Sequence, residues 1–365
     1  MIFCDLKLPS GGDELFVENG VFTDRPSGEK VSLGGKRVLP GMVDTHIHGA
    51  FGEAFDHADA DIHAAARGLA RHGVTAFCPT LSALSEEDAV AAIRNIVDAA
   101  RSQGEDEARV VGIHLEGPFV SPHRKGALNP DNLRMPDLAL FDRLVDAGEG
   151  LVKLMTVAPE LGGAIALAEH AESRGVRLSM GHSVATYEQA KAAVDGGFRR
   201  ATHIFNGMEP FSHRAPGVLG AALTDDRVVC EMICDLVHLD APAMEIVLRC
   251  KGFDRVIAIS DAISGAGLAD GDYELGGMSY HIADGVAKFP NGTICGSAVT
   301  LDRGLRNLLA MGVSHADAAR LTSKNAAEFI GADAGTLDRG ARADFIAADE
   351  HGGLCGVWLA GKRIV

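Results

Sequence analysis

The central part of the chain alternates short apolar runs with amphipathic helical stretches. Eight runs have the length and apolar character of buried strands, at residues 38–46, 74–80, 109–117, 151–157, 176–182, 200–205, 228–235 and 255–261. Helical patterns separate several of them, as in residues 85–102, where Ser85 and Asp88 are placed as a capping box. Apolar strands alternating with helices predict a parallel sheet covered by helices, and eight such strands can close a TIM (β/α)8 barrel.

A doubly wound open sheet is the competing architecture for this pattern. That fold normally carries a glycine-rich phosphate-binding turn after its first strand. In this chain the first strand instead leads into DTHIHG, residues 44–49. The sequence therefore favours the α/β barrel.

The two ends of the chain follow a different pattern from the centre. Short strand-like runs broken by turn residues occupy residues 1–40, and two more occur near the C-terminus within 336–365. We expect these ends to pair as one small β-sandwich domain attached to a barrel of residues 41–335. The polar, glycine-rich stretch 271–293 is interpreted as an inserted hairpin near the site.

Composition and charge narrow the classes of partner. The net charge is -16, with 50 acidic against 34 basic side chains, so the long-range field repels nucleic acid. No apolar run approaches the ~18 residues of a membrane span, and the N-terminus lacks a signal-peptide pattern. The seven cysteines are scattered singly, which is typical of reduced, buried thiols. We expect a cytoplasmic protein that binds neither nucleic acid nor membrane.

Histidines and carboxylates gather where the predicted strands end. In a barrel all carboxyl ends point to one rim, so these side chains are expected to line a common cavity. A single histidine at a strand end is more often structural than a ligand, but two histidines at i and i+2 share a strand face, and imidazole with carboxylate suits zinc, iron or manganese. The residues are Asp44, His46, His48, Glu116, His182, His203 and Asp261.

Asp261 has two interpretations. It could cap the turn that follows its strand, a frequent role for aspartate. It could also be the general base, because a metal-bound water needs only a nearby carboxylate to complete its deprotonation.

Basic and small residues form a second cluster beyond the later strands. Arg214 follows the sixth strand and His238 the seventh, and Arg gives the planar fork that a phosphate needs. His123, Arg124 and Lys125 add positive charge after Glu116. Each of these cationic side chains could instead be an ordinary solvent-exposed surface residue.

The sequence resembles the N-acetylglucosamine-6-phosphate deacetylases of the amidohydrolase superfamily over nearly its whole length. The likeness rests on PGMVDTHIHG, HLEGPFVSPHRKGALNP, SMGHS, THIFNGM with HRAPG, CDLVHLD, SDAISGAG, ICGSAVTLD and GTLDRGARADF. HLEGP together with THIFNGM is a specific pair, whereas DTHIHG marks only the superfamily.

The resemblance implies a set of roles. Glu116, His182 and His203 would hold the catalytic metal, and Asp261 would move protons. His46 and His48, which some members lack, allow a second metal. The implied substrate contacts are Ala127, Leu128, Asn206, Gly207, Arg214, His238, Ile294, Cys295 and Gly296. The resemblance also suggests a homodimer.

One residue departs from the family pattern. Where the family typically reads Ala-His-Asn-Pro, with the histidine on the substrate, this chain has Leu128. Leucine neither donates nor accepts a hydrogen bond, so one polar contact is missing or comes from elsewhere, such as His123.

The expected reaction is metal-dependent removal of the acetyl group from N-acetyl-D-glucosamine 6-phosphate, a small-molecule substrate. A deacetylase for the galactosamine epimer, or for another N-acyl amino sugar phosphate, is the nearest rival. A cyclic-amide hydrolase or deaminase is a more distant one, and a degenerate amidohydrolase that only binds is the rival outside enzymes.

Overall fold

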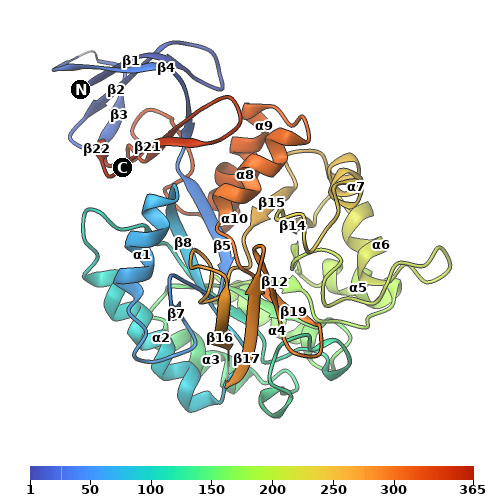
Figure 1. Ribbon diagram of the computed structural model, residues 1–365. Coiled ribbons are helices and arrows are strands. Elements are labelled where there is room, and N and C mark those ends of the chain that lie inside the picture. Colours follow the sequence, from blue (N-terminus) through green and yellow to red (C-terminus); the bar gives the residue numbers. More distant parts are fainter. Residues whose placement is uncertain (26, 276) are drawn as a thin grey trace.

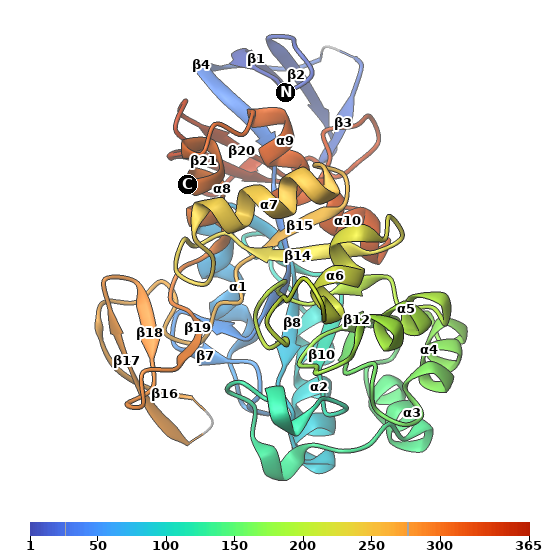
Figure 2. The ribbon, with the colours of Figure 1, turned by 90° about the vertical axis from the view of Figure 1, so that its right-hand side faces the viewer.

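The computed structural model describes residues 1–25, 27–275 and 277–365. Eight parallel strands follow one another in space in the same order as in the sequence. They form a barrel with its helices outside, and a small sheet sits at one end (Figures 1 and 2). The barrel strands are β5 (Met42–Ile47), β8 (Val74–Leu81), β10 (Ile113–Glu116), β11 (Val152–Val157), β12 (Arg177–Met180), β13 (Arg200–Ala201), β14 (Val229–Ile233) and β15 (Val256–Ile259).

The barrel closes between its first and last strands. The backbone N–H of Asp261, after β15, donates to the carbonyl of His46 on β5 at 3.0 Å, and the N–H of His48 donates to Ala262 at 2.7 Å. The eight predicted strands are therefore confirmed, and the open doubly wound sheet is excluded.

Helices cover the outside of the barrel. In α2 the side chain of Ser85 accepts the N–H of Asp88 at 3.1 Å, so Ser85 is the helix N-cap, but it donates to the Asp88 carboxylate instead of completing the predicted capping box. Ala92, Ile93 and Ile96 are buried against the barrel. The helices of the chain are α1 (Ile62–Arg71), α2 (Glu86–Arg101), α3 (Leu138–Ala147), α4 (Ala164–Ser173), α5 (Tyr187–Asp195), α6 (Gly217–Thr224), α7 (Ala241–Lys251), α8 (Leu301–Ala310), α9 (His315–Ala319) and α10 (Asn325–Ile330), of which α10 packs against interior residues of the barrel strands. Among the residues that the structure describes, no helix has both the length and the apolarity needed to cross a bilayer.

The first predicted strand, 38–46, is in fact divided between two sheets. Its beginning belongs to β4 (Lys30–Pro40) of the small sheet, and its end is β5 of the barrel. Gly41 lies at the transition, where a Cβ atom would fall 2.1 Å from Oγ1 of the buried Thr75. Only glycine lets the backbone pass this close to β8.

Strands from both ends of the chain build the small sheet. Its order is β22-β21-β20-β4-β1-β2-β3, and its remaining strands are β1 (Ile2–Lys7), β2 (Glu14–Glu18), β3 (Val21–Thr23), β20 (Phe345–Ala348), β21 (Leu354–Leu359) and β22 (Lys362–Arg363). The domain limits at residues 41 and 336 stay a prediction.

This small sheet folds over on itself. The rings of Phe22 on β3 and Phe345 on β20 are 6.2 Å apart, although three strands lie between them in the sheet order. Neighbouring strands are about 4.8 Å apart, so a flat sheet would separate these two residues by roughly 19 Å. The halves therefore pack face to face around an aromatic core of Phe3, Phe22, Phe345 and Trp358, as in a sandwich.

The segment predicted as a hairpin is larger than expected. Residues around 271–297 form a four-stranded antiparallel sheet of β16 (Gly271–Leu275), β17 (Met278–Ala283), β18 (Val286–Lys288) and β19 (Ile294–Ser297). Residue 276 of the predicted segment lies outside the described residues. The sheet stands beside the barrel (Figure 2).

We predict that Phe3→Ala will destabilise the small domain by about 3–5 kcal/mol, because the buried ring packs 5.0 Å from Phe345 and 5.9 Å from Trp358. Trp358 is the only tryptophan of the chain, so its fluorescence during urea unfolding reports on this core. Phe3→Leu, which keeps most of the volume, should cost clearly less. An unchanged unfolding midpoint for Phe3→Ala would contradict this assignment of the core.

Candidate active site

The predicted metal ligands converge at the carboxyl ends of the strands. Donor atoms of Glu116, His182 and His203 lie within 4.8 Å of one another, and so do those of His46, His48 and Asp261. Glu116 joins the two groups, since its Oε1 is 2.9 Å from Nε2 of His203 and its Oε2 is 3.1 Å from Nε2 of His48. The side chains come from β5, β10 and the turns after β12, β13 and β15.

The hydrogen bonds of two histidines orient their free nitrogens towards Glu116. Nδ1 of His182 lies 2.7 Å from the carbonyl oxygen of Arg124, and Nδ1 of His203 lies 3.1 Å from that of Asn206. A carbonyl only accepts, so each Nδ1 carries a proton, and the neutral form of each ring has its lone pair on Nε2.

These donors fit a divalent ion. The Nε2 atoms of His182 and His203 are 3.1 Å apart, and they lie 3.1 and 2.9 Å from the same oxygen of Glu116. Zinc binds imidazole and carboxylate at ~2.0–2.2 Å, which places its ligand atoms at about this mutual spacing. The chemistry of the set suits zinc, iron and manganese alike.

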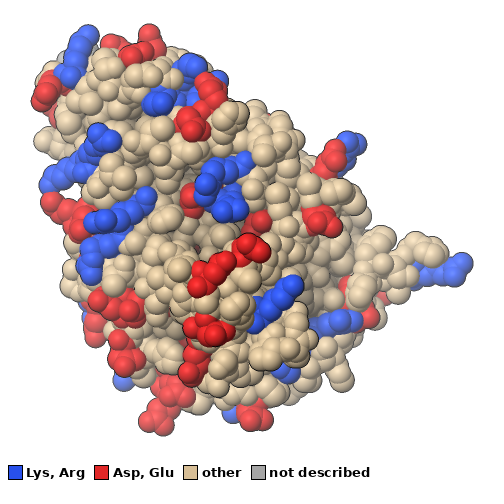
Figure 3. Space-filling model, in the orientation of Figure 1, with Lys and Arg blue, Asp and Glu red and all other residues tan. Residues whose placement is uncertain are grey.

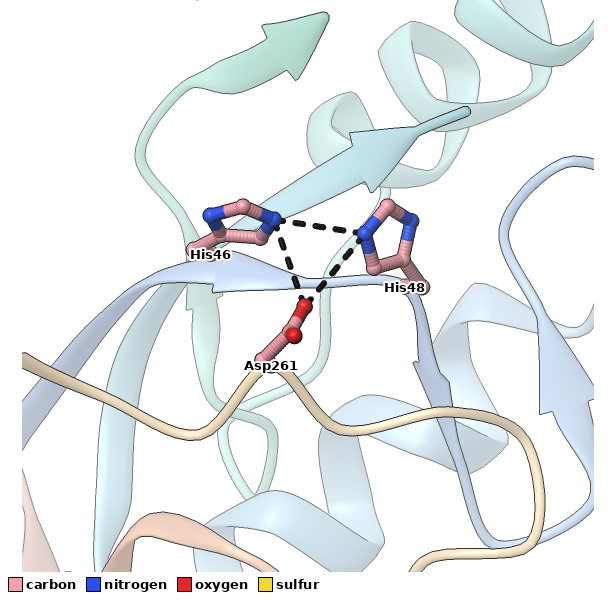
Figure 4. A group of neighbouring side chains, drawn as sticks. All are labelled: His46, His48 and Asp261. Carbon is pink, nitrogen blue, oxygen red and sulfur yellow. Dashed lines mark hydrogen bonds and ion pairs between the residues drawn. The ribbon is translucent and has the colours of Figure 1, made fainter. Parts of the chain in front are cut away.

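A second donor group lies beside the first. Figure 4 shows the ring of His46 on β5 and that of His48 directly after this strand, with the carboxylate of Asp261 turned towards both. Oδ1 of Asp261 is 3.4 Å from Nε2 of His46 and 3.6 Å from Nε2 of His48. Because this aspartate faces the donors, it does not act merely as a cap for the following turn.

The electrostatics of the site favour positive charge. Burial lowers the pKa values of His48 and His203, but the hydrogen bonds and negative charge of Glu116 outweigh it and raise both to about 9. Burial also opposes ionisation of Glu116, yet the histidines hold its pKa well below the usual range. A cation is therefore stabilised here, either as protons on the rings or as a metal ion that displaces them.

Three of these residues adopt unusual backbone conformations. The φ angles of His182, His203 and Asp261 are +48°, +27° and +52°. Side chains other than glycine rarely occupy this region, which costs about 1–3 kcal/mol each and is concentrated at functional sites. The left-handed residues end their strands in sharp turns.

The donor groups form the floor of a cavity of about 660 Å³. Gly207 approaches His182 so closely that a Cβ atom would lie 3.0 Å from its Nδ1, so this position requires glycine. The structure brings most predicted substrate contacts to the cavity wall: Ala127, Leu128, Asn206, Gly207, His238, Ile294, Cys295 and Gly296.

Arg214 is the predicted contact that the structure does not bring to this cavity. It lies on an exposed loop, residues 209–215, between β13 and α6. The loop projects from the body of the molecule at the right of Figure 1, and Figure 3 shows basic atoms at the tip of the same projection. Arg214 is the only lysine or arginine of this loop.

Leu128 packs within an apolar cluster at the edge of the cavity. Its side chain is buried against Ala83, Val120 and Leu133. The residue therefore anchors the loop after β10 by packing. His123, the suggested replacement for the family's histidine, is exposed and does not line the cavity.

Sequence reasoning missed a buried charged layer beneath the donors. Glu231 on β14 contacts His46, and Arg200 on β13 forms an ion pair with Glu231. Asp56, Ser82 and Asn132 also line the cavity without having been predicted. The available signal was a single charged residue within an apolar strand, as Glu231 is in VVCEMIC.

Comparison with known proteins agrees with this geometry. The sequence model of the Amidohydrolase family matches residues 37–363. The chain is 36% identical to the N-acetylglucosamine-6-phosphate deacetylase of Lysinibacillus sphaericus, over 87% of this chain and 82% of that protein. It is 34% identical to the N-acetylgalactosamine-6-phosphate deacetylase of Escherichia coli O157:H7, over 89% of this chain and 87% of that protein.

A solved structure is similar over the whole length. The N-acetyl-D-glucosamine-6-phosphate deacetylase of Mycobacterium smegmatis, as a variant in complex with N-acetyl-D-glucosamine-6-phosphate, matches with a TM-score of 0.92 and 33% identity, covering 100% of this chain and 99% of that one. Barrel, donor groups and these similarities together show that the chain is a hydrolytic enzyme of the amidohydrolase superfamily and belongs to its N-acetylglucosamine-6-phosphate deacetylase family.

Proposed function

We propose that the protein hydrolyses the acetamide of N-acetyl-D-glucosamine 6-phosphate to D-glucosamine 6-phosphate and acetate. The observation that carries this proposal is the convergence of Glu116, His182 and His203 beside Asp261, at the floor of a cavity large enough for an amino sugar phosphate. Relatives that act on this class of substrate resemble the chain over more than four-fifths of their own length.

Glu116, His182 and His203 would hold the catalytic ion, and His46, His48 and Asp261 could hold a second. A divalent ion supplies a Lewis acid that polarises the acetamide carbonyl and lowers the pKa of water towards ~7. Since no donor in either group is missing, the chain keeps what a degenerate, merely binding homologue would be expected to lose.

Asp261 is the proton-transfer residue of the proposed reaction. Its carboxylate faces the donors and is partly open to the cavity. It accepts a proton from the attacking water at a carboxylate oxygen as the water oxygen bonds to the acetamide carbon, and it returns this proton to the leaving nitrogen. The C–N bond then breaks, with acetate and the free amine as products.

His238 is the cavity residue best placed for the phosphate. Its Nδ1–H donates to Oδ2 of Asp235 at 2.7 Å, so the ring can donate to a phosphate oxygen through Nε2 in its doubly protonated form. No lysine or arginine of the described chain lines the cavity, so a further cation must come from elsewhere.

A homodimer is the second part of the proposal. Arg214 stands on a loop that projects away from its own barrel, and among the described residues no carboxylate forms an ion pair with it. An arginine on such a loop can serve the phosphate site of a second copy. Each subunit would then contribute this loop to the active site of the other subunit.

The first test combines metal analysis with acetate release. We expect purified protein to contain at least one equivalent of zinc, iron or manganese and to release acetate from N-acetylglucosamine 6-phosphate. Removing the ion with a chelator should abolish turnover, and adding metal back should restore it. Metal-free protein with full activity would contradict the proposal.

The epimer is the main rival substrate, because one relative acts on N-acetylgalactosamine 6-phosphate. The two substrates differ only in the configuration of one hydroxyl group. A side-by-side measurement of kcat/KM decides between them, and a clear preference for the galactosamine compound would replace the glucosamine assignment.

We predict that Asp261→Asn will lower kcat about 100- to 10,000-fold, because the amide cannot accept the proton. The ion held by Glu116, His182 and His203 should be retained, which metal analysis of the variant checks. Asp195→Asn, an exposed change on α5, is the control. Turnover that survives Asp261→Asn would rule out the assigned role.

We predict that Arg214→Ala will raise KM for the phosphorylated sugar about 10- to 100-fold, as expected for the loss of a charge-assisted hydrogen bond. KM for unphosphorylated N-acetylglucosamine should change little. Arg249→Ala, an exposed change on α7, is the control. Equal effects on both substrates would remove Arg214 from the phosphate site.

Mixed dimers of Arg214→Ala and Asp261→Asn subunits test whether the arginine acts across the interface. If it does, one site of each mixed dimer combines an intact Asp261 with an intact Arg214 and regains low KM. If Arg214 serves its own subunit, no intact site forms. A monomer in size-exclusion chromatography would likewise contradict the dimer.

A further inference from the structure

A charged layer lies inside the barrel, directly beneath the two donor groups. Its members are fully buried: His46 on β5, His114 on β10, Arg200 on β13 and Glu231 on β14. None of them except His46 belongs to the ligand sets that the proposed reaction uses. Burying charge is costly, so the layer needs an explanation.

One oxygen of Glu231 contacts both donor groups. Its Oε2 lies 3.0 Å from Nδ1 of His46 and accepts the backbone N–H of His203 at 2.9 Å. A carboxylate can only accept, so Nδ1 of His46 carries the proton and Nε2 keeps its lone pair. That Nε2 lies 3.3 Å from Nε2 of His48, in the direction of Asp261.

Arg200 holds Glu231 from the other side. It forms an ion pair with Oε1 of Glu231 and donates through Nη2 to Thr45 Oγ1 at 2.7 Å, next to His46 in the chain. Its guanidinium also lies over the ring of Phe329, 5.3 Å from the centroid. Each oxygen of the carboxylate therefore lies against a nitrogen of a neighbouring side chain.

Stability does not explain this ion pair. A buried pair is commonly no better for stability than apolar residues of similar volume, because the desolvation cost offsets the attraction. Binding a metal directly does not explain it either, although donor atoms of Glu231, His46 and His114 lie close together. The Arg200 guanidinium already occupies the carboxylate and repels a further cation.

We propose that Glu231, held by Arg200, is a positioning residue that orients His46 for a second metal ion and braces the backbone of His203 at the first. This inference rests on the proposed metal-dependent function but assigns residues that touch neither substrate nor ion. Partners of this kind, which hydrogen-bond a ligating histidine, typically change metal affinity 10- to 100-fold.

The test is a metal titration of chelator-treated protein with Zn²⁺ in the presence of a competing chelator. Wild-type protein should bind two equivalents. In Glu231→Gln the weaker equivalent should bind 10- to 100-fold less tightly, whereas the tighter one changes much less. The double variant Arg200→Met/Glu231→Gln, which leaves no buried unpaired charge, should show the same selective loss even where Glu231→Gln folds poorly.

Glu107→Gln is a matched control. Glu107 is also a buried carboxylate that accepts from an arginine, a histidine and a backbone N–H, but it lies outside the cavity, with Arg67, His63 and Gly104 as partners. The Glu107→Gln variant should leave both Zn²⁺ affinities unchanged, because removing a buried charge elsewhere does not alter the orientation of His46.

Two results would overturn the inference. One is a wild-type chain that binds a single equivalent, and the other is a folded double variant that binds both equivalents with wild-type affinity. Acetate release by the wild-type protein is measured separately. If the wild-type protein releases no acetate but the variants still lose the weaker Zn²⁺ site selectively, the substrate assignment is refuted and the positioning role of Glu231 stands.

Discussion

The hydrogen bond from Asp261 N–H to the carbonyl of His46 is the contact on which the site depends. It joins the last barrel strand to the first, and only in a closed barrel do these two ends become neighbours. Closure therefore brings a carboxylate from residue 261 beside the histidines of residues 46 and 48. An open sheet with the same strands would leave them at opposite edges.

Glu116 extends this arrangement across the mouth of the barrel. Its two oxygens contact histidines of both donor groups, and the positive charge that its burial demands is supplied by those rings or by an ion. Below it, Glu231 of the charged layer contacts the ring of His46 and the backbone N–H of His203. The two donor groups and the ion pair beneath them thus form one connected polar column inside a largely apolar barrel.

Much of this could be predicted from the sequence, because buried parallel strands are nearly continuous apolar runs and a polar residue at their ends is conspicuous. His182 and Glu116 were found in this way. Arg200 and Glu231 were not, because their pairing depends on which inward-facing positions of neighbouring strands share a layer. The course of the loop that carries Arg214, and the division at Gly41, likewise depend on tertiary packing that no local pattern encodes.

The left-handed backbone at His182, His203 and Asp261 limits how such an enzyme can be made more heat-resistant. Elsewhere in a protein, replacing a residue at a positive φ by glycine relieves the conformational cost of that backbone angle, and consensus design uses such replacements. Here the same exchange would remove a side chain from one of the two donor groups. Thermostability in this chain must therefore be sought in the small domain and the outer helices, leaving the turns at the rim untouched.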